Sequence, residues 1–164
     1  MNNLYILIGI IIFLGIIVRV FNFGNGRGKK AKYLYHRHNF FMTKAEHEFF
    51  DALVLSVGSD YFIFAQVHLP TLLDHKTRGQ NWRAALAHIN RKSVDFVLCD
   101  KKDLSPKLAI ELDDQSHERA DRQERDKEVE RILSEAGVPL LRIENQGSFN
   151  PDELATKIRE MALA

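Results

Sequence analysis

The sequence has too little cysteine for a disulfide framework and too little proline and glycine for a low-complexity chain. Its 164 residues include one cysteine, Cys99, with four prolines and nine glycines. A lone cysteine excludes an internal disulfide and also a zinc finger built on several cysteines. With 45% hydrophobic and 27% charged residues, the composition predicts one folded domain of ordinary size, located in the cytosol.

Acidic residues are missing from the N-terminal part of the chain. No aspartate or glutamate precedes Glu46, whereas seven of the 23 lysines and arginines lie before it. Residues 46–164 hold the other 16 basic residues and all 22 acidic residues, so their net charge is −6. The overall net charge of +1 therefore combines a basic N-terminal segment with an acidic domain. An acidic domain argues against tight nonspecific binding to nucleic acid, because phosphate neutralisation dominates that affinity.

One long apolar run stands at the N-terminus. From Leu4 to Val18, fifteen residues carry no charge, which is short for a membrane span of about 20 residues. Arg19 can extend its charge to the membrane surface and Phe21 suits an interface, so we expect one transmembrane helix that anchors the chain within residues 1–21. A cleaved secretory signal and a buried element of the folded domain are the alternatives. The first lacks a cationic start and a cleavage site, and the second lacks a polar stripe.

Basic residues follow this run. Residues 22–32 contain three glycines and four basic residues without apolar periodicity, which is typical of a linker, and we expect the linker to cover residues 22–39. Positive charge after a span predicts that this side faces the cytoplasm. The expected location is the inner cell membrane, crossed once, with a domain of residues 40–164 in the cytoplasm. Attraction of the linker to anionic lipid or to nucleic acid is an alternative interpretation of its charge.

Apolar periodicity and turn residues predict the elements of the domain. Thr43 and Glu46 have the spacing of a capping box, and Asn150 before Pro151 is typical of another helix start. The expected order is a helix over 44–57, a strand over 61–69, a helix over 80–90, hairpin strands over 94–99 and 107–112, a helix over 115–136, a strand over 138–143 and a helix after Asn150. This order predicts an α/β fold with a mixed sheet flanked by helices.

Three carboxylates fall near the ends of the two hairpin strands. Asp95 lies near the start of one strand, and Glu111 and Asp113 lie near the end of the next. Alternation places Glu111 and Asp113 on the same side of the sheet, where hairpin pairing would bring Asp95 beside them. Grouped carboxylates repel one another unless a cation lies among them, and oxygen ligands suit Mg²⁺ or Mn²⁺. The alternative is that each acid simply faces water.

A family resemblance gives these acids a context. The segment VDFVLCDKKDLSPKLAIELDDQSHERADRQERD, residues 94–126, followed by GVPLLRI, resembles the PD-(D/E)xK nuclease superfamily. More closely, it resembles the family of domain of unknown function 2726 (DUF2726), which is similar to very-short-patch-repair-type endonucleases. The resemblance covers roughly residues 40–145 and implies a restriction-endonuclease-like αβββαβ core. Its most specific part is the set Glu111, Asp113, His117, Arg125 and Asp126.

The resemblance also implies roles for individual residues. Asp95 corresponds to the motif aspartate and Glu111 to the acid of (D/E)xK. Glu46 falls where many members place an additional acid that orders the metal. With the Leu112 carbonyl, these groups would hold one or two Mg²⁺ or Mn²⁺ ions against a scissile phosphate. The reaction would be phosphodiester hydrolysis.

One position departs from the superfamily pattern, because Asp113 stands where the pattern has lysine. An aspartate cannot offset negative charge, but it could ligate a second metal ion or act as a general base. His117 could contact the phosphate or assist proton transfer, and the alternative is a histidine in solvent at the start of a helix. Arg125 could contact phosphate on family grounds alone, whereas most charges around it pair on a solvated helix face. Arg142 ends the last strand, where it pairs with an acid of the site or is exposed.

A strip without acidic residues lies between Asp74 and Asp95. It holds Trp82 among seven basic or histidine side chains: His75, Lys76, Arg78, Arg83, His88, Arg91 and Lys92. Basic side chains beside an aromatic ring suit a groove that follows phosphates. The candidate nucleic-acid-binding residues are therefore Lys76, Arg78, Arg83 and Arg125. The alternative is a surface helix whose Trp82 packs inward.

The sequence thus predicts a membrane-anchored, cytoplasm-facing domain that hydrolyses nucleic acid, DNA above all, with Mg²⁺ or Mn²⁺ as cofactor. The presence of Glu46, Asp95 and Glu111 together favours this function. Asp113 in place of lysine favours the alternative, a catalytically silent module of the same fold that binds nucleic acid or protein at the membrane. A membrane scaffold whose domain binds protein is a more distant hypothesis.

Overall fold

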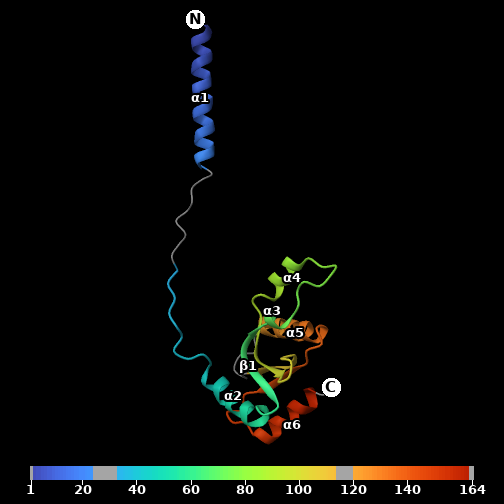
Figure 1. Cartoon of the computed structure of the whole chain (residues 1–164). Helices are drawn as coiled ribbons and strands as arrows, with labels where there is room; N and C mark the ends of the chain where they lie inside the picture. Colours follow the sequence, from blue (N-terminus) through green and yellow to red (C-terminus); the bar gives the residue numbers. More distant parts are fainter. Residues whose placement is uncertain (1, 24–32, 114–119, 163–164) are drawn as a thin grey trace. The chain divides into compact units, whose positions relative to one another are not determined.

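The chain forms two compact units, residues 1–39 and 40–164, in a computed structural model that describes residues 2–23, 33–113 and 120–162 (Figure 1). The described part of the first unit includes the helix α1 (Asn2–Phe23). Among the described residues, no helix is both long and apolar enough to cross a membrane. The membrane anchor expected within residues 1–21 stays a prediction.

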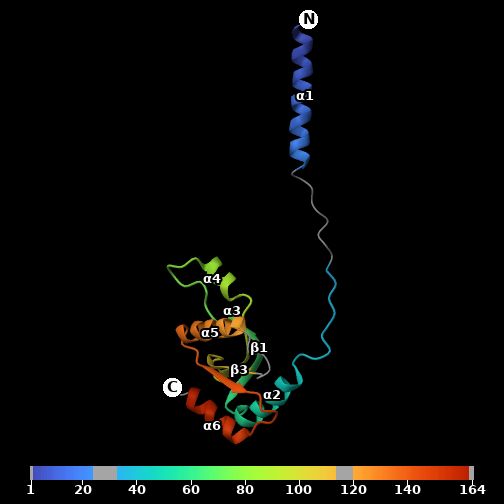
Figure 2. The ribbon, with the colours of Figure 1, turned by 180° about the vertical axis from the view of Figure 1, so that it is seen from behind.

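A mixed sheet of four described strands forms the centre of the second unit (Figures 1 and 2). The strands are β1 (Tyr61–His68), β2 (Ser93–Asp100), β3 (Pro106–Asp113) and β4 (Leu140–Glu144), and they lie side by side in that order. β2 pairs antiparallel with both β1 and β3, and β4 pairs parallel with β3. The predicted hairpin is confirmed. The helix between β3 and β4 provides the crossover that a parallel pair requires.

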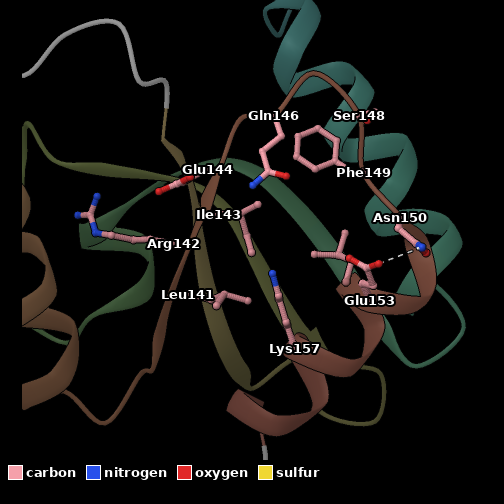
Figure 3. A pocket seen from close by; sticks show the side chains of 11 residues that line it. Leu141, Arg142, Ile143, Glu144, Gln146, Ser148, Phe149, Asn150, Glu153 and Lys157 are labelled. Carbon is pink, nitrogen blue, oxygen red and sulfur yellow. Dashed lines mark hydrogen bonds between the residues drawn. The ribbon is translucent and has the colours of Figure 1, made fainter.

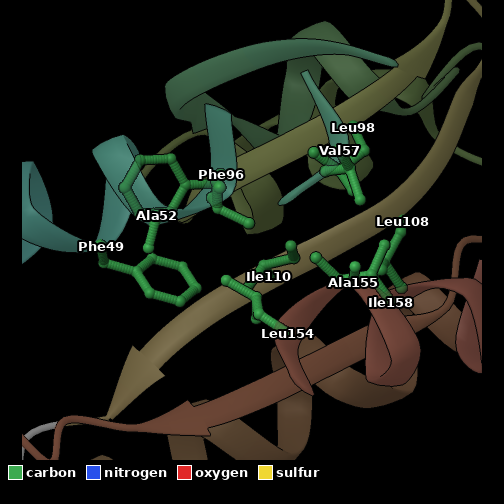
Figure 4. Packing of buried hydrophobic residues seen from close by; sticks show 11 residues of the cluster. Phe49, Ala52, Val57, Phe96, Leu98, Leu108, Ile110, Leu154, Ala155 and Ile158 are labelled. Atoms are coloured by element: carbon green, nitrogen blue, oxygen red, sulfur yellow. The ribbon is translucent and has the colours of Figure 1, made fainter. Parts of the chain in front are cut away.

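Two helices, α2 (Lys44–Val57) and α6 (Pro151–Ala162), pack on one face of the sheet. α2 begins at the predicted capping box, in which the Glu46 N–H donates to the Thr43 hydroxyl and the Thr43 N–H donates to the Glu46 carboxylate. The buried residues between these helices and the sheet form the larger hydrophobic cluster (Figure 4): Phe49, Ala52, Leu53, Val57, Phe96, Leu98, Leu108, Ile110, Leu154, Ala155 and Ile158.

The opposite face of the sheet is packed by α5 (Ala120–Glu135). Side chains alternate along β3, so Ala109 points away from its neighbours in the larger cluster. It packs instead with Val129 and Leu133 of α5. The sheet therefore has a hydrophobic layer on each side, which is why its central strands are buried.

Two short helices, α3 (Leu69–Leu72) and α4 (Trp82–Ile89), connect β1 to β2. α4 was predicted, and it begins where the Asn81 side chain accepts the N–H groups of the next turn. α3 was not predicted, because Pro70 indicates only the end of a strand. The chain instead continues as one helical turn, since proline is tolerated in the first turn of a helix.

The predicted class is confirmed: the second unit is mixed α/β with a mixed sheet flanked by helices. Without the two short helices, its order is α2, β1, β2, β3, α5, β4 and then α6. α5 was expected to begin at residue 115 and is described from Ala120, because residues 115–119 lie outside the described part of the chain.

Candidate active site

Gln66 and Asp95 lie at the point where β1 and β2 change the side of the sheet that they bury. Successive pairs of the register pack on opposite faces, Ala65–Phe96 in the cluster of α2 and α6 and Val67–Val94 in the cluster of α5. Residues two apart in a regular strand share a face, so the alternation breaks at the intervening pair. Gln66 has a left-handed backbone, with φ of 53°, which is uncommon for a residue other than glycine. An irregular point in both strands therefore positions Gln66 and Asp95.

Asp95 uses its side chain to hold the end of β3. The register between β2 and β3 extends to Phe96 opposite Ile110. Just past this pair, the Leu112 N–H donates to the Asp95 carboxylate at 2.9 Å. The carboxylate thus takes the place of a backbone carbonyl, which leaves no buried donor without a partner at this point. Asp95 is fixed beside the last residues of β3.

Arg142 lies between the two acids of β3. The parallel register pairs Arg142 with Glu111. The Arg142 guanidinium nitrogens are 2.9 Å from Glu111 Oε2 and 2.9 Å from Asp113 Oδ1. Both carboxylates therefore face the same cation, and of the two interpretations of Arg142, the ion pair is the one found. The Glu111 side chain keeps only 15% of its surface exposed, so solvent screens this pair weakly.

Glu46 approaches the same place from the first turn of α2. One of its carboxylate oxygens accepts the Thr43 N–H at 2.6 Å, and the other accepts the Gln66 amide at 2.7 Å. Gln66 therefore connects α2 to β1. A carboxylate with a donor on each oxygen is held in one orientation.

We define the acid cluster as Glu46, Asp95, Glu111 and Asp113, and burial raises the pKa of two of its members, Asp95 and Glu111. Burial raises the pKa of Glu111 to about 7, the nearby Arg142 opposes the rise, and the charge of Asp95 adds to it. Burial also raises the pKa of Asp95, and the charges of Glu46 and Asp113 add to that rise. Neighbouring carboxyls whose pKa values are raised in this way are typical of functional sites.

The donor set of the acid cluster suits a hard divalent cation, because carboxylate oxygens are the ligands that Mg²⁺ prefers. Within residues 2–23, 33–113 and 120–162, however, no group of three or more His, Cys, Asp or Glu side chains is arranged to hold a metal ion. Arg142 engages Glu111 and Asp113, and the Leu112 N–H engages Asp95. The predicted ligands therefore lie together, but around an arginine.

The predicted basic strip lies on the surface of the domain. Lys76 and Arg78 are exposed in the loop before α4, and Arg83 is exposed in the first turn of α4. The Arg83 guanidinium lies 4.8 Å from the centre of the Trp82 ring, and Trp82 is 43% exposed. This exposure disfavours the inward packing of Trp82 that was the alternative.

Two predicted site residues lie outside the part of the chain that the structure describes. His117 falls within residues 114–119, and the side chain of Arg125 is also outside the described set. Their contacts with phosphate stay predictions.

A cavity of about 470 Å³ lies between β4 and the start of α6 (Figure 3). Its lining includes Ile143, Gln146, Glu153 and Lys157. Figure 3 shows the Arg142 side chain pointing away from Glu153 and Lys157. β4 thus contributes to the wall of this cavity, while the Arg142 guanidinium points away from it and pairs with Glu111 and Asp113.

Sequence reasoning did not single out Gln66. The signal that could have indicated it is a lone amide within the apolar and aromatic stretch YFIFAQV, residues 61–67. Its left-handed backbone could not be predicted, because glycine and asparagine are the residues that favour that conformation.

The second unit matches a protein family over nearly its whole length. Residues 38–161 fit the family described as "Protein of unknown function (DUF2726)", which is more than half of the chain. No curated protein and no solved structure matches the sequence. On the extent of the family match, the chain belongs to the DUF2726 family.

Proposed function

We propose that this domain hydrolyses phosphodiester bonds in nucleic acid with the help of a divalent cation, with DNA as the first substrate to test. The observation that carries the proposal is the gathering of four carboxylates in the acid cluster, from α2, β2 and β3. Partly buried carboxylates that repel one another cost stability. Packing alone therefore gives no reason to bring four of them together, whereas metal-assisted hydrolysis does.

The order of elements supports membership of the PD-(D/E)xK superfamily. α2, β1, β2, β3, α5 and β4 follow the helix–strand–strand–strand–helix–strand order that the resemblance implies. Under this correspondence, Asp95 and Glu111 are the two motif acids. Both belong to the acid cluster, as a catalytic role requires.

Each residue of the acid cluster has a part in the proposed reaction. Asp95, Glu111 and Asp113 would hold Mg²⁺ or Mn²⁺, and the bound ion would supply a water of lowered pKa and neutralise charge on the phosphate. Glu46, fixed by Gln66, keeps negative charge beside Asp95. Arg142 provides on β4 the positive charge that the superfamily pattern places on β3, and its planar guanidinium suits a phosphate oxygen.

One observation favours a second function, a catalytically silent module that binds nucleic acid. Arg142 already forms ion pairs with both Glu111 and Asp113, so two of the proposed metal ligands have a cationic partner without a metal ion. For this function, the exposed Lys76, Arg78 and Arg83 would carry the affinity for phosphate.

Cleavage of plasmid and single-stranded DNA by the full-length chain, with Mg²⁺ or Mn²⁺, separates the two functions. The isosteric double variant Asp95→Asn, Glu111→Gln should cleave on the order of 10²-fold or more slowly. The charge-matched control Glu130→Gln, Glu160→Gln removes two exposed acids and should cleave like the wild type.

A thermal-shift measurement serves as the second readout. Mg²⁺ should raise the melting temperature of the wild type and of the control, but not that of the Asp95→Asn, Glu111→Gln variant. Equal cleavage by all three proteins would contradict the assignment of these acids. DNA binding without any cleavage, in a folded wild type, would favour the silent module.

A further inference from the structure

A second cavity, of about 420 Å³, opens beside β1 and α3, and we call it the β1 cavity. Its lining includes Phe64, Gln66, His68, Thr71, Cys99 and Leu104. Val97, which pairs with Phe64, packs in the cluster of α5, so the cavity lies on the α5 face of the sheet. Phe64 keeps 45% of its surface exposed, and its ring is therefore accessible to a ligand.

The lining of the β1 cavity combines an aromatic ring with groups that form hydrogen bonds. Phe64 supplies the ring, and the lining also includes the polar residues Gln66, His68 and Thr71, whose side chains can form hydrogen bonds. A ligand that complements this set is flat, has an aromatic face and carries polar atoms at its edge. Nucleobases have these properties, and proteins bind unstacked bases in this way. The volume also falls in the range of about 300–1,000 Å³ that is usual for small-ligand sites.

Gln66 connects the β1 cavity to the acid cluster. It lines the cavity and donates to Glu46 at 2.7 Å. Phe64 is two residues away on the same strand, which corresponds to about 7 Å. A nucleotide whose phosphate lies at the acids can therefore place an adjoining base against Phe64.

We propose that the β1 cavity binds an unpaired nucleobase beside the reacting phosphate, so that the substrate class is single-stranded nucleic acid. This inference rests on the proposed hydrolysis of nucleic acid. A base inside a duplex is stacked on both faces and cannot reach a ring in a cavity wall.

The test measures binding of the full-length chain to a short labelled oligothymidylate and to a duplex of the same length, by fluorescence anisotropy in EDTA. Without a metal ion, binding is observed separately from cleavage. The wild type should prefer the single strand, and Phe64→Ala should weaken that binding roughly five- to a hundredfold, as expected for one lost stacking contact. Phe64→Trp keeps an aromatic face and should retain the affinity. Leu55→Ala, at an exposed position of α2, is the matched control and should leave it unchanged.

Several results would overturn the β1 cavity as a base site. They are unchanged single-strand affinity in a folded Phe64→Ala variant, a preference for the duplex, and absence of single-strand binding by the wild type. Sedimentation gives one more: if Phe64→Ala abolishes self-association without changing oligonucleotide affinity, the face binds a second copy of the chain. Failure of the proposed hydrolysis is distinguishable, because it would abolish cleavage while the dependence of binding on Phe64 persists.

Discussion

Replacement of Glu111 by glutamine should change how the stability of the domain depends on pH. Burial raises the pKa of Glu111 from its ordinary 4.5 to about 7. Between these two values, the folded state binds more protons than the unfolded state, because the unfolded carboxyl has already ionised. The free energy of unfolding therefore decreases as pH rises through this window. The destabilisation is complete above pH 7 and absent below pH 4.5.

The size of the effect follows from the two pKa values. One pH unit of difference corresponds to about 1.4 kcal/mol, so the rise from 4.5 to about 7 corresponds to about 3 kcal/mol at most. Residual exposure of the Glu111 side chain lets solvent screen part of this free energy, so we expect a destabilisation of about 2 kcal/mol. The pKa of about 7 already includes the attraction between Glu111 and Arg142. In the Glu111→Gln variant, Arg142 keeps Asp113 as its partner. The variant should therefore be about 2 kcal/mol more stable than the wild type near pH 8 and about equal near pH 5.

Urea denaturation followed by circular dichroism, across this pH range in EDTA, measures the difference directly. The other charged groups that act on Glu111 are Asp95, Asp113, Asp126 and Arg142. Burial raises the pKa of Asp95 in the same direction, so the variant should keep part of the wild-type slope. The exposed Glu160→Gln serves as control and should follow the wild type at every pH. A Glu111→Gln curve parallel to the wild type, or a wild type that gains stability from pH 5 to 8, would refute the reasoning.

Three further changes test the local structure by the same denaturation assay. Gln66→Gly should be about 1 kcal/mol more stable than Gln66→Ala because of the left-handed backbone. At Phe62, in the regular part of β1, the Phe62→Ala variant should be more stable than Phe62→Gly. The same order of stability at both sites would contradict backbone strain at Gln66. Thr43→Ala should cost about 1 kcal/mol through loss of the cap, and Thr43→Ser should restore it; no cost would show that the capping box adds nothing. Leu133→Ala should cost about 2–5 kcal/mol, against less than about 0.5 for the exposed Leu55→Ala, and equal effects would contradict the α5 packing.

The fold follows from the sequence where local signals decide the structure. The capping box at Thr43 and Glu46 starts α2 because its two hydrogen bonds need only four consecutive residues. The hairpin is predictable because residues 100–106 form a polar turn between two apolar runs that each fit one strand.

The candidate site is only partly a local property of the sequence. Alternation along β3 brings Glu111 and Asp113 to one side of the sheet, so a partner shared by both acids could be predicted. That this partner is Arg142 could not be predicted from alternation. Arg142 reaches them through the parallel register of β3 and β4, which connects residues about thirty positions apart. Gln66 enters the site through a backbone conformation that its residue type does not favour. Contacts of these two kinds depend on the assembled sheet.

If the domain follows the PD-(D/E)xK pattern, as we propose, the position of Arg142 explains physically how it can lack the lysine of that pattern. A lysine at position 113 would place a second cation beside the Arg142 guanidinium, whereas Asp113 gives that guanidinium a second carboxylate at 2.9 Å. Asp113 and the arginine on β4 are thus mutually compatible. The positive charge near Glu111 therefore comes from the adjacent strand β4. A motif written along β3 alone would miss it.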